Sequence, residues 1–296
     1  MRKLAIIIPF FKIDFFEETL LSLKNQTNQL FNVYIGNDFS DADPVHLIEK
    51  HNQNTNIYYT KFNENLGGKG ALVDQWKRCI ELSKDEDWLM ILADDDYISE
   101  NFVEEFYNNI EEAKLKQINL LRFKMRRVSE NNQFLVDLEQ PKVYKAIDYV
   151  WDDEIHKRFI SISENVFSRN VYETKGFRNY PLAWRVPMMM YLDFTNVGEV
   201  LGINNAFVAI RRSEQQLSWR KDVDSYKRAS MKLFYHDVLN EYSEYFSKEQ
   251  NLKFLKVYTF YCNGKNELKQ SLSSLYYTYG GFKEYIKFKI KSIFKI

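Results

Sequence analysis

Three adjacent acids, Asp94, Asp95 and Asp96, directly follow an apolar run at residues 88–93. Residues 89–93 are predicted to form a short strand that is buried on both faces, as in the interior of a parallel sheet. Ligands of open α/β sheets bind at the carboxyl ends of the strands, which is where these acids lie. Because three adjacent negative charges repel one another, a divalent cation with its preference for oxygen ligands would stabilise them. Such a cation would in turn hold the phosphates of a substrate.

A second interpretation of the same acids needs no ligand. A solvated acidic turn can cap the helix that is predicted to begin near Ser99, with Asp96 or Ser99 as the N-cap residue. The triplet alone does not decide between the two interpretations, so the surrounding elements have to be considered.

Strands and helices alternate in the part of the chain that leads to the triplet. We predict strands at residues 4–8, 32–36, 56–60 and 89–93, and helices at residues 15–26, 45–51 and 71–82. Pro9 is expected to end the first strand, and the second strand runs into Asn37, Asp38 and Asp41. This alternation indicates a mainly parallel, right-handed α/β sheet, with acids at the ends of two strands.

A glycine-rich loop at residues 63–70 precedes the third predicted helix. Its glycines can provide positive φ angles in a turn. Alternatively, its backbone N–H groups and the helix N-terminus can bind an anion, with Lys69 as a charge partner. It is not a P-loop, because Gly70 stands where serine or threonine would have to follow the lysine, and it lacks the GxGxxG pattern. Both interpretations stay open.

The second half of the chain has weaker patterns. We predict a helix at residues 102–114, a strand at 119–125, a hairpin around Asn131 and Asn132, a half-exposed strand at 160–168 and a strand at 203–212. Helical spacing then dominates from residue 223 to residue 263. We therefore expect an α/β domain at residues 1–220 and a helical C-terminal extension at residues 221–296.

Composition narrows the class of protein. A chain of 296 residues with 45% hydrophobic residues can bury one large α/β core. Basic and acidic residues number 41 each, so the net charge does not favour a nucleic-acid partner. Cys79 and Cys262 form no CxxC pair, which argues against a zinc site or a disulfide framework and favours a reducing, cytoplasmic location. No apolar stretch approaches the ~20 residues that cross a bilayer.

The C-terminal segment, residues 282–296, has two stripes at helical spacing. Phe282, Tyr285, Ile286, Ile290, Ile293 and Phe294 share one face, and Lys283, Lys287, Lys291 and Lys295 repeat every four residues. A basic amphipathic helix of this kind can lie on an anionic membrane, such as the inner face of the cytoplasmic membrane. Alternatively, the apolar face packs on the α/β domain and the lysines are only solvated.

In this order, the motifs resemble those of glycosyltransferase family 2, the inverting nucleotide-sugar transferases with the GT-A fold. The resemblance rests on residues 6–11, 37–41, 65–68 and 93–96, which lie within about the first 100 residues. Residues 177–184 and 205–218 are similar to the distal half of bacterial polysaccharide transferases. The resemblance implies a Rossmann-like, mainly parallel sheet and a role in making a surface polysaccharide from a nucleotide sugar, most simply a UDP-sugar, and a glycan or lipid-linked acceptor.

The resemblance also assigns site residues. Pro9, Phe10, Phe11, Asp38, Lys69, Asp94 and Asp95 would bind the donor nucleotide, with Asp38 accepting hydrogen bonds from its base or ribose. Asp96 and Asp95 would hold Mn²⁺ or Mg²⁺, which offsets the charge on the departing nucleoside diphosphate. A register with Ala93 and Asp95 as the two ends of the acidic motif is also possible.

Inverting transfer further requires a base that takes the proton from the acceptor hydroxyl. Related sequences carry an acidic pair where this chain has Val186, Pro187 and Met188, none of which can accept a proton. Asp193 is our candidate for the base, and Glu199 is a poorer one. If neither acts, the chain is a nucleotide-binding or glycan-binding protein with impaired catalysis. Arg211 and Arg212 could meet a phosphate or be merely solvated.

Overall fold

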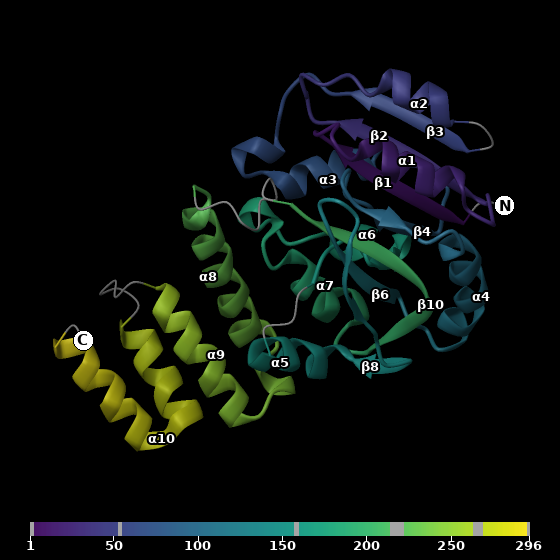
Figure 1. Cartoon of the computed structure of the whole chain (residues 1–296). Coiled ribbons are helices and arrows are strands. Elements are labelled where there is room, and N and C mark those ends of the chain that lie inside the picture. Colours follow the sequence, from purple (N-terminus) through teal and green to yellow (C-terminus); the bar gives the residue numbers. More distant parts are fainter. Residues whose placement is uncertain (1–2, 53–54, 157–159, 214–221, 263–268, 295–296) are drawn as a thin grey trace. The chain divides into compact units, whose positions relative to one another are not determined.

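The computed structural model describes residues 3–52, 55–156, 160–213, 222–262 and 269–294. They fall into two units, Met1–Asn179 with Val186–Lys221, and Tyr180–Arg185 with Asp222–Ile296. The first unit contains the sheet, and the second contains the C-terminal helices (Figure 1).

Four parallel strands form one half of the central sheet (Figure 1). They are β1 (Leu4–Phe10), β2 (Phe31–Asn37), β3 (Asn56–Lys61) and β4 (Trp88–Ile91), and α1 (Phe16–Lys24), α2 (Val45–His51) and α3 (Leu72–Ile80) connect them. Leu4 pairs with both Phe31 and Trp88, so β1, β2 and β4 begin at the same level. Their carboxyl ends consequently meet at one edge of the sheet, which we call the carboxyl edge.

The other half of the sheet is mixed. The strand order is β3-β2-β1-β4-β9-β6-β10-β5, with β7 paired to β6 and β8 paired to β10. β6 (Leu120–Ser129) and β10 (Glu199–Arg212) are parallel to each other, whereas β9 (Asn165–Ser168) is antiparallel to both of its neighbours. The remaining elements of this half are β5 (Tyr97–Ile98), α4 (Phe102–Leu115), β7 (Phe134–Leu138), β8 (Val143–Lys145), α5 (Ala146–His156), α6 (Arg169–Lys175) and α7 (Val186–Thr195).

Three local predictions need correction. Pro9 does not end β1 but lies inside it, opposite Gly36. On the β4 side, Ile7 O accepts a hydrogen bond from Leu92 N, and on the β2 side, Phe10 O accepts one from Asp38 N. The nitrogen of Pro9 therefore faces the β4 side. Because the last residue pair between β1 and β4 is Ile7 with Ile91, no N–H group is needed from Pro9 there. In the predicted strand at 160–168, only the fully buried Asn165–Ser168 is a strand. The helix begins at Phe102, in agreement with the predicted range 102–114, but its N-cap is Asn101, without a side-chain cap, and not Asp96 or Ser99.

The second unit consists of helices. They are α8 (Asp224–Glu241), the short turn η3 (Ser243–Tyr245), α9 (Lys248–Tyr261) and α10 (Lys269–Phe294). The Ser247 side chain and Gln250 form a reciprocal capping box that starts α9. Gly281, with φ 68° and ψ −172°, breaks α10 into two helices. The segment with the turn η2 (Pro181–Ala183) belongs to this unit, because Ser230 Oγ donates to Pro181 O at 2.7 Å. The predicted α/β sheet with C-terminal helices is confirmed.

Gly36 in β2 gives a direct test of how closely α3 packs on the sheet. A Cβ at this position would lie 2.3 Å from Cys79 Sγ and 2.8 Å from the Phe62 ring. We therefore predict that Gly36→Ala lowers the stability by about 1–3 kcal/mol, measured as a decrease in the thermal unfolding midpoint. In the double variant with Cys79→Ala, the loss should be smaller than the sum of the two single losses. An unchanged midpoint for Gly36→Ala would contradict this packing.

Candidate active site

Direct hydrogen bonds join the ends of β1, β2 and β4 at the carboxyl edge. The backbone N–H groups of Phe11 and Lys12 both donate to Asp94 Oδ2 at 2.7 Å. From the β2 side, Asp38 N donates to Phe10 O at 2.9 Å, and Ser40 Oγ donates to Phe11 O at 2.6 Å. The structure thus brings together Asp38, Asp94 and the segment after β1.

The three acids of the triplet have different surroundings. Asp94 is held by the two N–H groups just described. Asp96 is buried, at 2% exposure, and its oxygens accept hydrogen bonds from Ser163 Oγ at 2.7 Å and from Arg211 N at 3.1 Å. The carboxylate of Asp95 is half-buried and receives no hydrogen bond from another residue in the described part of the chain. Of the three, Asp95 is the carboxylate available to a ligand.

Burial of these acids makes their negative charges costly. It raises the pKa of Asp94 to about 7, with a further contribution from the neighbouring Asp95 charge. Burial also raises the pKa of Asp95, against the opposing charges of Lys12 and Arg211, and it raises the pKa of Asp96 well above its usual range. A cation beside Asp95 would favour the ionised forms.

Arg211 organises the triplet, a role that the sequence analysis did not find. Its side chain is fully buried rather than solvated. Its guanidinium donates to Asp95 O at 3.0 Å, to Glu130 O at 2.9 Å and to Asn132 Oδ1 at 2.8 Å, pairs with Glu18, and lies 4.2 Å from the centre of the Phe15 ring. Because these groups occupy the guanidinium, the structure favours neither of the two alternatives for Arg211, contact with a phosphate or exposure to solvent.

Asp38 is also fully engaged. Its carboxylate accepts hydrogen bonds from Leu66 N at 2.7 Å, Gly67 N at 2.9 Å, Asn65 Nδ2 at 3.0 Å and Arg78 Nη2 at 2.6 Å. A carboxylate offers about four acceptor positions, so these donors leave none for a nucleotide. The predicted direct contact between Asp38 and the nucleotide of the sugar donor does not agree with this geometry. Asp38 instead fixes the glycine-rich loop beside the site.

The glycine-rich loop is a turn and not an anion cradle. The N–H groups of Leu66 and Gly67 bind Asp38, and that of Gly68 binds Asn65 Oδ1. The N–H groups of residues 69–71 bind the carbonyls of Leu66 and Gly67, and Gly70 has a φ of 87°. Lys69 lies in the turn η1 (Gly67–Lys69) with a side chain that is 68% exposed and 4.0 Å from Glu64. The exposed side chain of Lys69 remains available to a phosphate.

The structure does not bring Asp193 to the carboxyl edge. Asp193 lies near the end of α7, where Arg178 binds both of its carboxylate oxygens at 2.9 Å. The ring of the next residue, Phe194, is 5.4 Å from that of Phe167, which pairs with Leu89 at the amino end of β4. Glu199 begins β10 and is therefore also at the amino end of its strand. The prediction that Asp193 is the base does not agree with this placement.

The start of α7 offers no alternative base. Val186, Pro187 and Met188 are all buried, with exposures of 1% or less for Val186 and Met188. Every residue from Val186 to Phe194 is buried, because this helix is apolar all round. The position where related sequences carry acids is therefore occupied by core residues.

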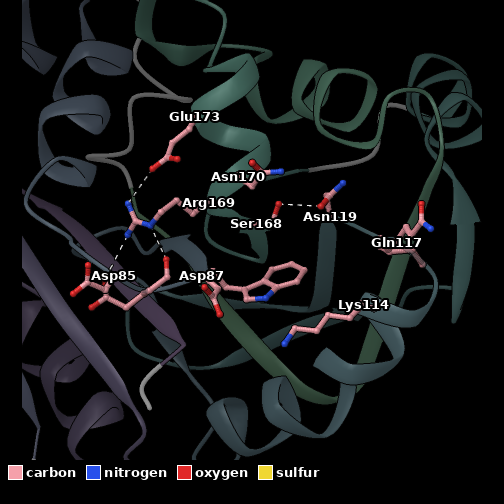
Figure 2. A pocket seen from close by; sticks show the side chains of 13 residues that line it. Asp85, Asp87, Lys114, Gln117, Asn119, Ser168, Arg169, Asn170 and Glu173 are labelled. Atoms are coloured by element: carbon pink, nitrogen blue, oxygen red, sulfur yellow. Dashed lines mark hydrogen bonds and ion pairs between the residues drawn. The ribbon is translucent and has the colours of Figure 1, made fainter.

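A separate cavity of about 520 Å³ lies at the opposite edge of the sheet (Figure 2). It is lined by residues near the start of β4 and β6, among them Asp85, Asp87 and Asn119. Arg169 pairs there with Glu86 at 3.5 Å and with Glu173 at 3.9 Å, and Ser168 Oγ donates to Asn119 Oδ1 at 3.0 Å (Figure 2). Since the acidic triplet follows the carboxyl end of β4, this cavity is not part of the candidate site.

The part of the chain that matches a known protein family includes the residues of the carboxyl edge. Residues 5–174 match the sequence profile of the family described as Glycosyl transferase family 2, a range that includes Asp38 and the acidic triplet. No curated protein is significantly similar to the chain in sequence.

Solved structures share the fold at low sequence identity. S. aureus TarS 1–349 in complex with UDP-GlcNAc has a TM-score of 0.65 and 16% identity, over 94% of this chain and 80% of that one. The longer S. aureus TarS structure has a TM-score of 0.61 and 14% identity, over 94% of this chain and 48% of that one. GalNAc-T7 with UDP, GalNAc and Mn²⁺ has a TM-score of 0.59 and 12% identity, over 99% of this chain and 58% of that one. The chain thus spans about half the length of the latter two.

Arg211 and Arg212 are neighbours with opposite environments, which makes them a matched pair. We predict that Arg211→Met lowers the free energy of unfolding by at least about 2 kcal/mol, because the acceptors around its fully buried guanidinium, among them Asp95 O, lose a charged donor. Arg212→Met, at an exposed position, should change it by less than about 0.5 kcal/mol. Chemical denaturation of the purified variants measures both. Equal effects of the two substitutions would show that Arg211 has no special role.

Proposed function

Because the chain belongs to glycosyl transferase family 2 and has the GT-A fold, we propose that it transfers a sugar, most simply a hexose, from a UDP-sugar to a hydroxyl group of a glycan or lipid-linked acceptor, with inversion. The observation that carries the proposal is the free carboxylate of Asp95 between two acids that the protein itself holds. That arrangement supports a site in which Asp95 meets the diphosphate of the donor through a cation.

The residues at this edge fit a divalent metal. In the described part of the chain, no three His, Cys, Asp or Glu side chains form a ready metal site. Asp95 would therefore supply a single ligand, and the phosphates of the donor and water would supply the others, which is a usual arrangement for Mg²⁺. The geometry favours the register with Asp95 as the ligand, and it does not favour Asp96, whose oxygens are already occupied. When bound, Mn²⁺ or Mg²⁺ offsets charge on the leaving diphosphate.

The other donor contacts follow from the same geometry. We assign the backbone of this segment, Pro9 and the exposed ring of Phe11 to the nucleoside, since the segment is tied to Asp94. The ring of Phe10 is excluded, because it is fully buried and lies 4.7 Å from that of Phe16. Asp94 orients the segment through two N–H groups, and Asp38 positions the neighbouring loop. The exposed ammonium of Lys69 can approach a phosphate. The chain thus supplies the groups that orient the donor.

A second function has a specific observation in its favour. The start of α7 is apolar and buried, so no carboxylate there can deprotonate the acceptor. A protein that binds a UDP-sugar or glycan without turnover is therefore the alternative. UDP-sugar transfer or hydrolysis, assayed across several donors with acceptor present, separates the two functions. Binding without any turnover favours the alternative.

The metal assignment is tested by Asp95→Asn. We predict that this variant loses at least about tenfold in Mn²⁺-dependent affinity for UDP, measured by calorimetry, because an amide is a far weaker ligand than a carboxylate. Asp87→Asn, which changes an exposed acid at the opposite edge, should bind UDP as the wild type does. Unchanged affinity in Asp95→Asn, or UDP binding that does not respond to chelation of the metal, would contradict the assignment.

We also propose that the last helix contacts an anionic membrane, which would place the protein at the inner face of the cytoplasmic membrane. In the described residues, no helix combines the length and apolarity needed to span a bilayer. Phe282, Ile286 and Ile290 share one stripe and are 67%, 36% and 50% exposed, whereas Phe288 stacks on Tyr276 at 4.5 Å. The side chains of residues 291–296, which include Lys291, Ile293, Phe294 and Lys295 of the predicted stripes, lie outside the described residues. Residues 282–296 carry five lysines and one glutamate, which suits anionic lipids.

This membrane contact is tested by replacing Phe282, Ile286 and Ile290 with serine together. The fraction of protein bound to phosphatidylglycerol vesicles in a sedimentation assay should fall about tenfold or more, because the stripe no longer inserts apolar groups. Leu115→Ser, which removes another exposed apolar side chain, should bind as the wild type does. Absence of vesicle binding by the wild-type protein at low salt would disprove the contact.

A further inference from the structure

Phe39, directly after Asp38, has a backbone conformation that phenylalanine rarely adopts. Its φ angle is 55°, in the left-handed region, where the Cβ of any L-residue approaches its own backbone. Glycine would adopt this conformation without cost. This strain is offset either by the surrounding structure or by an interaction of the phenyl ring.

Packing within the protein does not provide that interaction. The side chain of Phe39 is 53% exposed. In the described part of the chain, no aromatic pair includes its ring, and Lys61 Nζ lies 5.8 Å from the ring centre, a distance at which an exposed cation–π contact contributes little. Burial thus does not explain why a bulky side chain is retained at a strained position.

The backbone around Phe39 is fixed by its neighbours. Asp38 N donates to Phe10 O at 2.9 Å, Ser40 N donates to Asn37 Oδ1 at 2.8 Å, and Ser40 Oγ donates to Phe11 O at 2.6 Å. These bonds tie the turn to the end of β1. The ring of Phe39 is thereby anchored next to the segment of Phe11, whose own side chain is 47% exposed. Two exposed phenyl rings, those of Phe11 and Phe39, accordingly follow the ends of β1 and β2 at the carboxyl edge.

We propose that Phe39 is a specificity residue whose ring stacks on the nucleobase of the donor. The inference rests on the proposed function. Strained residues persist where a ligand or the surrounding structure repays their cost. A base offers a flat π-surface of the size that one phenyl ring covers, and stacking of this kind strengthens binding substantially. The diphosphate, held near Asp95, makes no use of an apolar ring.

The test compares Phe39→Gly with Gln117→Gly. Gln117 also has a left-handed φ, of 57°, and it is exposed at the opposite edge of the sheet, so it controls for relief of backbone strain. Both variants should have a thermal unfolding midpoint at or above that of the wild type. In calorimetry with Mn²⁺, Phe39→Gly should lose about tenfold or more in affinity for UDP and keep its affinity for pyrophosphate. Gln117→Gly should keep both affinities, and Phe39→Trp should keep the affinity for UDP.

The outcomes separate the two proposals. If the wild-type protein binds UDP and Phe39→Gly binds it equally well, Phe39 does not contact the base. An equal loss of affinity for UDP and for pyrophosphate would also overturn the inference, because it would show a disturbed site and not a missing stacking partner. If the wild-type protein binds no UDP, the proposed function itself fails and the inference fails with it.

Discussion

The concentration of negative charge at the end of β4 is the constraint on which the rest of the site depends. Three consecutive carboxylates lie where a buried strand ends, and burial raises the pKa of each. The fold satisfies two of them. Backbone N–H groups from the end of β1 bind Asp94, while Ser163 and the backbone of Arg211 bind Asp96. The carboxylate of Asp95 accepts no hydrogen bond from another residue of the described chain, so it is the group that a cation can stabilise.

The same hydrogen bonds make the carboxyl edge a connected structure. Arg211, at the end of β10, joins the triplet to Glu18 on α1 and to the turn between β6 and β7. On the other side, Asp38 joins β2 to the glycine-rich turn and to Arg78 of α3. Several charged residues that in sequence look like ligand contacts thus hold the edge in shape. A preformed site of this kind reduces the ordering that a ligand would otherwise have to bring about.

The structure contains more of the groups that the proposed reaction needs for the sugar donor than of those it needs for the acceptor. On the donor side, the end of β1, the exposed ring of Phe11 and the free carboxylate of Asp95 lie on one edge. On the acceptor side, α7 is a wholly buried helix with no acid at its start, and Asp193 is paired with Arg178 away from this edge. Nucleotide binding is consequently the part of the function that the geometry supports most directly. Turnover depends on a base that the chain does not provide at the expected position.

The sequence by itself determined the α/β alternation, the parallel half of the sheet and the position of the acids at the strand ends. These follow from local patterns: runs of β-branched residues, helical spacing and the polar residues at which each strand stops. It also indicated the hairpin at residues 131–132, where Asn132 has a positive φ. The sequence predicted the wrong end for β1 and the wrong length for β9. Both depend on which neighbouring strand pairs with each residue, and this is not visible in the local pattern.

Only the tertiary structure decided which acid is free, and what Asp38, Asp193 and Arg211 do. The partners of Asp96 are 67 and 115 residues away along the chain, and Arg211 pairs with Glu18 at a separation of 193 residues. Whether a carboxylate can bind a ligand depends on the hydrogen-bond donors around it. The fold brings these donors from distant parts of the chain, so the sequence alone could not assign the roles of these residues.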